Sequence, residues 1–296
     1  MKLKERHREW ICGYSYTLPA LLFMLVLIGY PIVYNIAISF QNMTAKNVNL
    51  GEVDFIGLEN YRLLFDDPIF LLSLKNTVIY TVICIAIQFT LGFALALLFN
   101  KQFAVSKALR GFLLISWMLP TTVTALIFKF MFSMDGVINQ FLIGLHILEE
   151  PLGWLVQENT AMVVAIIANC WVGIPFNMLL INTGLTAIPR EIYESAAIDG
   201  AGSFSRFFSI TLPMLKQSIL SVLVLGFVYT FKVFDLIFVM TGGGPVNATE
   251  VLSTYSYRQS FKFYDFGGGA AAANVLFICL FIIGLLYLKL LGREEE

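Results

Sequence analysis

The chain has 296 residues, of which 58% are hydrophobic and only 13% are charged, and its formal net charge is −1. One water-soluble core of this length cannot bury so much apolar side chain, so the composition excludes an ordinary soluble domain and implies a lipid-facing surface. The sequence therefore predicts an integral membrane protein.

Uncharged runs mark the expected spans. About 20 apolar residues in a helix cross the hydrocarbon core, and four runs reach that length without Asp, Glu, Lys or Arg: 10–45, 76–100, 159–189 and 266–288. Two weaker runs, 111–128 and 217–240, adjoin or contain charges. Continuous runs favour helices over the alternating, roughly ten-residue strands of a membrane barrel. We predict an all-α, polytopic fold with six spans, at about 14–40, 72–100, 109–132, 159–185, 213–240 and 269–291.

The distribution of Lys and Arg predicts the orientation, because these residues accumulate in short cytoplasmic loops. With both termini inside, the cytoplasmic segments hold twelve of them and the outer segments five. We therefore expect a cytoplasmic segment at 1–13, followed by a transmembrane domain at 14–292. The first apolar run is too long for a signal peptide and lacks a small-residue cleavage site, so it is interpreted as an uncleaved span.

The outer segments are long enough to carry structure. Residues 46–68 end at Asp67-Pro68, a typical helix start, and 241–268 open with "TGGGP", expected to form a flexible bend. Residues 133–158 have an amphipathic pattern that predicts a short helix on the outer face, with the apolar positions Ile138, Phe141, Leu142, Leu145 and Trp154. Surface packing and docking of an external partner both remain open for these segments.

No pattern of metal ligands or catalytic residues is found. Four cysteines, Cys12, Cys84, Cys170 and Cys279, lie in or beside separate spans without C-x-x-C spacing. His7 and His146 are isolated, and no G-x-S-x-G, H-E-x-x-H or Walker A sequence occurs. We therefore expect no active site, no metal site and no cofactor in this chain.

A polar loop at 189–213 separates the fourth and fifth spans. Pro189 suits the first turn of a helix, and two following glutamates complement its dipole, so a short helix is expected at 189–199. Gly200 and Gly202 would end this helix, and Ser203 would cap a second one. Small residues between them allow another backbone to approach closely. A docking element for a partner and a plain interfacial connector are both compatible with this pattern.

Two charges lie in the fifth span. Lys232 and Asp235 are three residues apart, so they are expected to share a helix face and to pair. Such pairing would offset part of the roughly 2.5 to 3.5 kcal/mol that each charge costs inside the membrane. The pair is interpreted either as a structural clamp or as a polar lining for a passing solute. Lys129 is expected instead to extend its charge to the interface.

The polar loop resembles the EAA loop of permease subunits in binding-protein-dependent ABC importers. Its Glu194-Ser195-Ala196, followed after three residues by Gly200, matches the motif, with Ser195 at a position where alanine is usual. Three stretches, "FIGLENYRLLFDD" at 55–67, "IPREIYESAAIDGAGSFSRFFSITLP" at 188–213 and "FDLIFVMTGGGP" at 234–245, are similar to sugar permeases of the maltose and glycerol-3-phosphate type.

This resemblance implies the type I ABC importer permease fold and a role in carrying a carbohydrate or related solute across a bacterial or archaeal cytoplasmic membrane. It implies four kinds of partner: the lipid bilayer, a second permease subunit, two cytoplasmic ATPases that use ATP and Mg, and an extracellular or periplasmic solute-binding protein. No nucleic acid partner is expected. The alternatives are a self-sufficient secondary transporter, which should show repeats with broken helices, and a membrane enzyme or assembly factor, which would need a polar catalytic cluster.

The resemblance also implies site residues. ATPase coupling would involve the loop residues Glu194, Ser195, Ala196, Asp199, Gly200 and Ala201. Solute contacts of the maltose type of permease match Asn169, Gly173, Phe176, Tyr229, Thr230 and Val233, to which Lys232 and Asp235 are added. Plain helix packing is the alternative for these positions. Docking of the binding protein would involve Gly242, Gly243 and Gly244.

Overall fold

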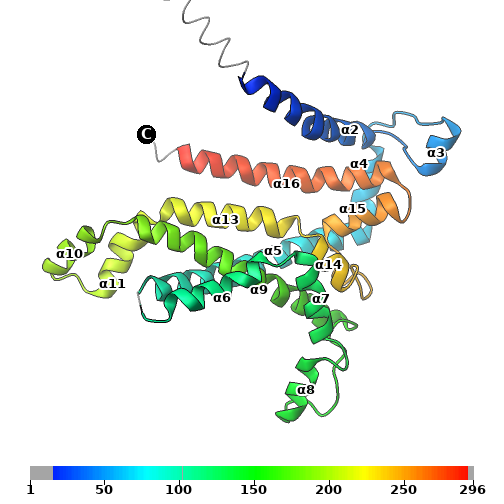
Figure 1. The fold of residues 1–296 in the computed structure, drawn as a ribbon. Coiled ribbons are helices and arrows are strands. Elements are labelled where there is room, and N and C mark those ends of the chain that lie inside the picture. Colours follow the sequence, from blue (N-terminus) through cyan, green and yellow to red (C-terminus); the bar gives the residue numbers. More distant parts are fainter. Residues whose placement is uncertain (1–15, 102, 293–296) are drawn as a thin grey trace, which may run out of the picture. The chain divides into compact units, whose positions relative to one another are not determined.

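The computed structural model describes residues 16–101 and 103–292, so the expected cytoplasmic segment 1–13 lies outside the described residues. The chain divides into two compact units (Figure 1). One consists of Met1–Asp66 and Ser256–Val275, and the other of Asp67–Tyr255 and Leu276–Glu296. The described residues contain helices and two isolated bridges but no strand, which confirms the all-α prediction.

The first unit is held together by polar side chains beside its long helices. It contains the helical stretch Tyr16–Ile38, with the π-helical turn η1 (Leu25–Gly29) and α2 (Tyr30–Ile38), then α3 (Ala45–Leu50) and α4 (Glu59–Asp66). It also contains the start of α16 (Phe266–Gly292). Asn274 accepts a hydrogen bond from Asn35 at 2.8 Å and donates one to the Tyr61 hydroxyl at 3.0 Å. These bonds tie α2, α4 and α16 together.

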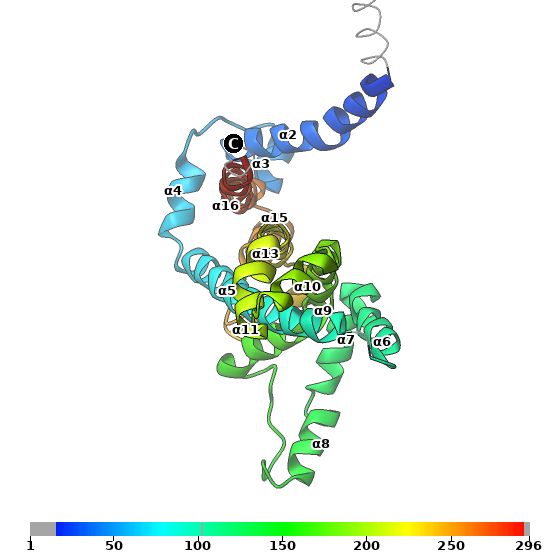
Figure 2. The same ribbon diagram turned by 90° about the vertical axis from the view of Figure 1, so that its left-hand side faces the viewer.

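The second unit is built on three helices that pack side by side: α5 (Pro68–Asn100), α9 (Glu158–Ala187) and α13 (Lys216–Phe231). Figure 2, which looks along them from one end, shows the three clustered together. Asp67 caps α5 by accepting a hydrogen bond from the Ile69 amide at 2.8 Å, and Pro68 occupies its first turn. An aspartate cap followed by proline is a favoured helix start. The sequence Asp67-Pro68 therefore starts a helix in the way its pattern predicts.

The α5 and α9 helices approach each other closely at a glycine. A Cβ atom on Gly92 would lie 2.6 Å from the Asn177 Cβ and 3.0 Å from the Ile174 carbonyl oxygen. Helix association inside a bilayer depends on such close packing at small residues, because the lipid is as apolar as the side chains. Gly92 thus sets the separation of the two central helices.

Two expected spans are broken into separate helices. In the third, expected at 109–132, α6 (Ser106–Met118) and α7 (Thr121–Met131) meet at 96°, so two helices occupy the range expected for one span. Leu119 between them has an extended backbone, with a ψ of 141°. Pro120 explains the break, since proline disfavours helical geometry in the residue before it. Five described helices are long and apolar enough to span a membrane, or six if this bent pair forms one span.

The fifth span is interrupted after α13. Helical geometry is lost at Val233 and Phe234, and α14 (Asp235–Met240) starts directly after them. The side chain of Ser253 donates a hydrogen bond to the Val233 carbonyl oxygen. This bond satisfies a backbone group that the break exposes.

The outer halves of the two broken spans, α7 and α14, pack against each other. Lys129 donates a hydrogen bond from Nζ to the Val239 carbonyl oxygen at 3.0 Å. The ammonium group of Lys129 is therefore bonded to the backbone near the end of α14. Its extension to the interface stays a prediction.

Short helices connect the longer ones. The outer segment between α7 and α9 carries α8 (Val137–Gly144), where a short helix is predicted. The Asn139 side chain organises this segment, because its amide donates to the Ser133, Met134 and Leu152 carbonyls and its oxygen accepts from the Trp154 indole. The remaining helices are α10 (Arg190–Ile198), α11 (Ser203–Arg206), η2 (Phe207–Thr211), α12 (Leu212–Met214) and α15 (Leu252–Phe261).

We predict that Gly92→Ala lowers the thermal stability of the purified chain in detergent. The added methyl group overpacks the contact between α5 and α9, which typically costs about 1 to 3 kcal/mol. Gly111→Ala in α6 is the matched control, since a Cβ there meets nothing within 4 Å and alanine favours the helix by about 1 kcal/mol over glycine. Circular dichroism melts should show a lower Tm for Gly92→Ala alone; equal melting of the two variants would refute the close contact.

Candidate functional site

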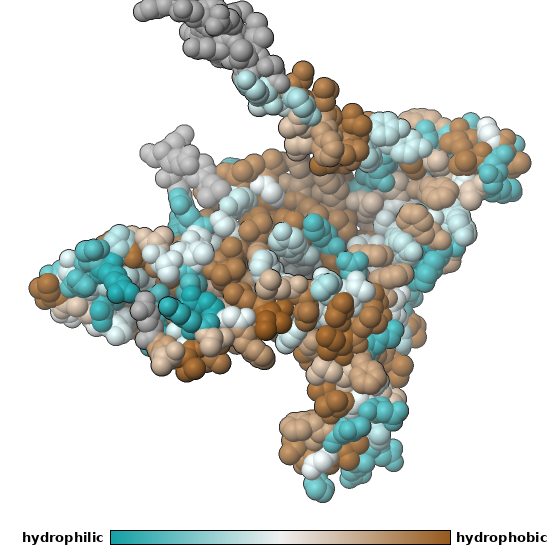
Figure 3. Space-filling view, viewed as in Figure 1, coloured by the Kyte–Doolittle hydropathy of each residue, from teal (hydrophilic) through white to brown (hydrophobic). Residues whose placement is uncertain are grey.

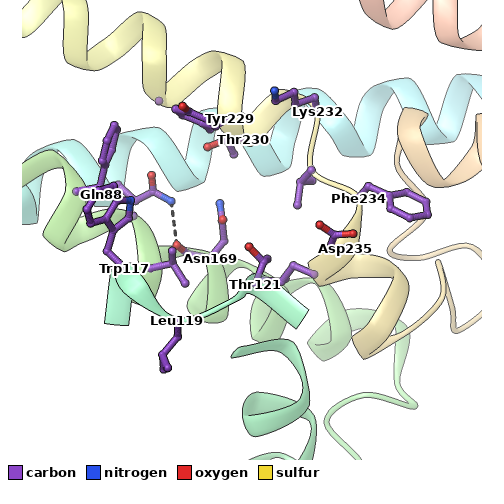
Figure 4. Close-up of a pocket in the computed structure, with 16 residues that line it drawn as sticks. Gln88, Trp117, Leu119, Thr121, Asn169, Tyr229, Thr230, Lys232, Phe234 and Asp235 are labelled. Carbon is purple, nitrogen blue, oxygen red and sulfur yellow. Dashed lines mark hydrogen bonds between the residues drawn. The ribbon is translucent and has the colours of Figure 1, made fainter. Parts of the chain in front are cut away.

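A pocket of about 390 Å³ opens in the second unit where the two helix breaks face the central helices (Figure 4). Its walls come from α5, α6, α9 and α13, and from the residues around each break. In a bilayer, interrupted backbone is tolerated where it is buried in protein or lines a cavity. Both breaks therefore occur where membrane physics allows them.

All eight residues predicted for the solute path line this pocket. They come from one face of α9, from the end of α13, from the break that follows it and from the start of α14: Asn169, Gly173, Phe176, Tyr229, Thr230, Lys232, Val233 and Asp235. Residues from distant parts of the sequence thus line one cavity. Their contact with a solute stays a prediction.

Aromatic rings form a continuous row along the pocket. Trp117 of α6 stacks on Phe176 of α9, with ring centroids 5.7 Å apart and an interplanar angle of 29°. Phe176 meets Tyr229 of α13 edge to face, with a centroid distance of 5.9 Å and an angle of 86°. The ammonium group of Lys232 lies 5.5 Å from the Tyr229 ring centroid. The row therefore ends in a cation–π contact.

Lys232 and Asp235 do not lie on one helix face, so the expected pairing is wrong. Lys232 terminates α13, whereas Asp235 is the first residue of α14 beyond the break. Within the described chain these two side chains form no ion pair, and Figure 4 shows them on separate sides of the pocket. The spacing argument fails because it assumes an uninterrupted helix. Both charges instead face the cavity.

Gly173 has a packing role in addition to its predicted place in the solute path. A Cβ atom there would lie 2.2 Å from the Cδ of Gln88 on α5. Gln88 occupies this space and donates a hydrogen bond from Nε2 to the Asn169 carbonyl oxygen at 3.2 Å (Figure 4). Gly173 therefore admits the Gln88 amide to the pocket wall.

Sequence reasoning missed half of the lining residues: Gln88, Trp117, Leu119, Thr121, Val172, Gly226, Phe234 and Leu236. Gln88 and Trp117 belong to spans for which no motif was recognised. Pro120 was the available signal, since a proline inside an apolar run predicts a break and therefore a cavity nearby. Phe234 and Leu236 could have been inferred only after the second break was known.

The polar loop folds much as predicted. Its first helix, α10, ends before Gly200, whose φ is 81°. This left-handed conformation favours glycine. The second helix differs from the prediction, because Gly202 is the N-cap of α11 and Ser203 is its first residue, with no side-chain capping bond. From there α11, η2 and α12 lead into α13 with only short interruptions.

The surface of this loop is polar and accessible. Glu194, Ser195, Asp199 and Gly200 are exposed, and Ala196 and Ala201 are half-buried. Figure 3 shows hydrophilic residues gathered at this end of the unit, around α10 and α11. Ile198 and Phe204 are apolar exceptions, with 87% and 78% of their surface exposed. The loop thus has a polar surface from which two apolar side chains, Ile198 and Phe204, project.

One hydrogen bond joins α10 to the start of the fifth span. The Tyr193 hydroxyl lies 3.0 Å from the Thr211 hydroxyl oxygen. Tyr193 also packs against a buried cluster to which Leu185 of α9 and Leu215 beside α13 belong. Displacement of α10 would therefore act directly on both helices that flank the loop.

The expected flexible bend at 241–245 is a closed, hydrogen-bonded turn. Thr249 donates from its hydroxyl to the Gly244 carbonyl at 2.6 Å, and from its amide to the Gly243 carbonyl at 3.2 Å. Gly243 is buried, Gly244 is half-buried and Gly242 is exposed. Of the three glycines predicted to dock a partner, only Gly242 is exposed in this unit.

Known proteins resemble this chain in both sequence and fold. Residues 88–294 match the family described as the binding-protein-dependent transport system inner membrane component. The sulfoquinovosyl glycerol transport system permease protein SmoG of Agrobacterium fabrum is 37% identical, over 94% of this chain and 89% of its own. The trehalose/maltose transport system permease protein MalF of Thermococcus litoralis is 34% identical, over 98% and 96% of the two chains.

A solved structure shares the fold. In the crystal structure of a bacterial ABC transporter involved in import of the acidic polysaccharide alginate, one chain aligns with a TM-score of 0.83. The alignment covers 99% of both chains at 23% sequence identity. The two chains therefore share one architecture along their whole length.

We predict that Gly173→Ala and Gln88→Ala have non-additive effects on stability. Gly173→Ala alone should lower the Tm, because its methyl group collides with the Gln88 side chain. Gln88→Ala removes the side chain that the new methyl group would meet. The Tm of the double variant should therefore fall by less than the sum of the decreases in the two single variants. A thermal double-mutant cycle in detergent measures this coupling, and additive shifts would contradict the contact.

Proposed function

The chain belongs to the family of inner membrane components of binding-protein-dependent transport systems, and we propose that it carries a carbohydrate across the cytoplasmic membrane. Proteins of this family are membrane permease subunits of ABC importers, in which a partner ATPase hydrolyses ATP. The chain is accordingly an integral membrane protein and not an enzyme. The observation that carries the proposal is the convergence of eight predicted path residues on one pocket.

The chemistry of the pocket supports a carbohydrate as the solute. Sugar rings have apolar C–H faces and hydroxyl-bearing edges, so they suit a cavity that combines aromatic rings with a few placed polar groups. Here Phe176 and Tyr229 supply rings, while Asn169, Gln88 and Thr230 supply amide and hydroxyl groups. Relatives whose names specify trehalose/maltose, lactose and sulfoquinovosyl glycerol transport agree with this class.

The polar loop is proposed to couple the permease to its ATPase. The exposed Glu194 of α10, with Gly200 just beyond the end of this helix, would seat in a cleft of the cytoplasmic ATPase, and the half-buried Ala196 would allow a close fit. Motion of α10 would reach α13 through the bond between Tyr193 and Thr211. ATP and Mg would be used only by the partner ATPases, so this chain needs no cofactor.

Further partners follow from the same proposal. A second, homologous permease subunit would complete the pore, and two ATPase subunits would drive it. A solute-binding protein would dock outside, where the turn at 241–245 exposes Gly242. Both termini would be cytoplasmic, in agreement with twelve Lys and Arg residues on the expected inner segments and five on the outer ones. A self-sufficient secondary transporter is not favoured, because the relatives are permease subunits of ABC importers.

We predict that the complete importer takes up radiolabelled maltose, trehalose or lactose into proteoliposomes. We further predict that the Gly200→Ala variant hydrolyses ATP without a matching uptake of sugar. Gly200 adopts a φ of 81°. Alanine is strained in this left-handed conformation, which costs roughly 1 kcal/mol or more. Uptake per ATP hydrolysed should fall several-fold. Glu194→Lys, which inverts an exposed charge on α10, should have the same effect.

Gly202→Ala is the matched control, since Gly202 has an ordinary φ of −69° and no atom within 4 Å of an added Cβ. It should retain coupled uptake. If the wild-type importer takes up none of the three sugars, the result would count against the carbohydrate proposal. Equal behaviour of the two glycine variants would count against the coupling role of Gly200.

We also predict that exchanging Lys232 and Asp235 does not restore transport. Each single alanine variant should impair uptake, because each charge faces the pocket from its own side of the break. An exchange would rescue a direct ion pair, but it places each charge against the wrong neighbours here; Lys232, for example, lies over the Tyr229 ring. Uptake assays of the two alanine variants and the exchange variant test this prediction. Restored uptake in the exchange variant would support the structural clamp instead.

A further inference from the structure

Trp117 combines three properties that suit contact with a solute. It is the penultimate residue of α6, just before the break at Leu119. Its ring stacks on Phe176 at a centroid distance of 5.7 Å, yet 43% of its surface remains exposed. It also lines the pocket, on the side away from Asp235 (Figure 4). An indole ring that is supported by a neighbouring aromatic ring and still accessible can receive a second planar partner.

The indole N–H of Trp117 is also available. A buried tryptophan usually pairs this donor, and the half-buried Trp154 donates it to the Asn139 oxygen at 2.8 Å. The Trp117 side chain is exposed instead. Among the described residues, the Trp117 indole N–H makes no hydrogen bond, and the Trp117 ring stacks on Phe176. The residue therefore offers a ring surface and a hydrogen-bond donor toward the same cavity.

We infer that Trp117 is the surface on which the ring of the solute stacks, and that it restricts the pocket to cyclic sugars over acyclic polyols. This inference rests on the proposed carbohydrate transport. A pyranose ring presents a contiguous apolar C–H face that covers an indole ring, while a hydroxyl that extends past the edge of the indole can accept a hydrogen bond from its N–H. An acyclic polyol such as sorbitol has no persistent flat face and gains less from the same surface.

The row of rings explains why the position matters. Trp117, Phe176 and Tyr229 come from α6, α9 and α13, so a solute stacked on the open face of Trp117 rests on a row of rings that joins three helices. Phe176 supports both neighbours, by stacking on one and by an edge-to-face contact with the other. The amide of Gln88 lies on the same side of the pocket as Trp117 (Figure 4). Stacking on Trp117 would therefore bring the hydroxyls of the ring within reach of this amide.

The chain contains a matched control in Trp171. It too belongs to a membrane helix, is 39% exposed and packs against an aromatic ring, since its centroid lies 5.8 Å from that of Phe128. Trp171 does not line the pocket. Losing an indole ring at either position removes a similar amount of apolar surface, but only Trp117 would lose contact with solute.

Transport by the complete importer in proteoliposomes gives the first test, with maltose, trehalose and lactose as probes. Trp117→Ala should reduce the sugar imported per ATP hydrolysed about tenfold, the factor equivalent to about 1.4 kcal/mol. Trp117→Phe should restore about half of this loss on a logarithmic scale. Trp171→Ala should keep the wild-type ratio. Equal ratios for Trp117→Ala and Trp171→Ala would overturn the inference.

A binding measurement separates this inference from the proposed function. The tryptophan fluorescence of the complete importer in lipid nanodiscs is titrated with methyl α-glucoside, and with sorbitol at equal osmolarity. A change specific to the glucoside should be present in the wild type and in Trp171→Phe, and absent in Trp117→Phe. If the wild type imports none of the three sugars, the carbohydrate proposal fails for them. The fluorescence result still decides on Trp117, because a signal unaffected by Trp117→Phe, or no signal, rejects the stacking role.

Discussion

The close approach of α5 and α9 is the constraint on which the second unit depends. Two glycines permit it in different ways: Gly92 lets the backbones meet near Ile174 and Asn177, and Gly173 leaves space for the Gln88 side chain. Inside lipid no hydrophobic effect presses helices together, so contact at small residues must supply the attraction. With this pair fixed, α13 packs on both helices and α6 packs on α9, and the pocket forms among them.

The pocket also depends on two interruptions of the helical backbone. Pro120 causes one of them through its effect on Leu119. The other has no proline or glycine at residues 232–234, and the structure offers no local cause for it beyond the Ser253 bond that accommodates the Val233 carbonyl. Because α7 and α14 pack together beyond the breaks, the two interruptions work as one feature. Each turns side chains into the cavity that a straight helix would direct elsewhere.

The sequence was informative where the signal is local, and misleading where it depends on tertiary structure. The α10 helix and the turn at Gly200 could be predicted because caps, charges and glycine act within a few residues. The pairing of Lys232 with Asp235 could not, because helical spacing says nothing once the helix breaks. Gln88 and Trp117 were missed for a different reason: their roles arise from contacts with Gly173 and Phe176 on another helix. Such contacts leave no pattern in a single sequence.

The hydrogen bond between Tyr193 and Thr211 connects the polar loop to the segment that leads into α13, so a displacement of the loop would tilt this helix. One end of this helix is attached to the polar loop, and the other carries Tyr229 and Lys232. Its 16 residues span about 24 Å at about 1.5 Å per residue, so a tilt of roughly 10° displaces the far end by about 4 Å. That displacement is comparable to the spacing of stacked rings. If the polar loop couples to an ATPase as proposed, a small displacement of α10 would be enough to separate Tyr229 from Phe176, and so to open the aromatic row between α9 and α13.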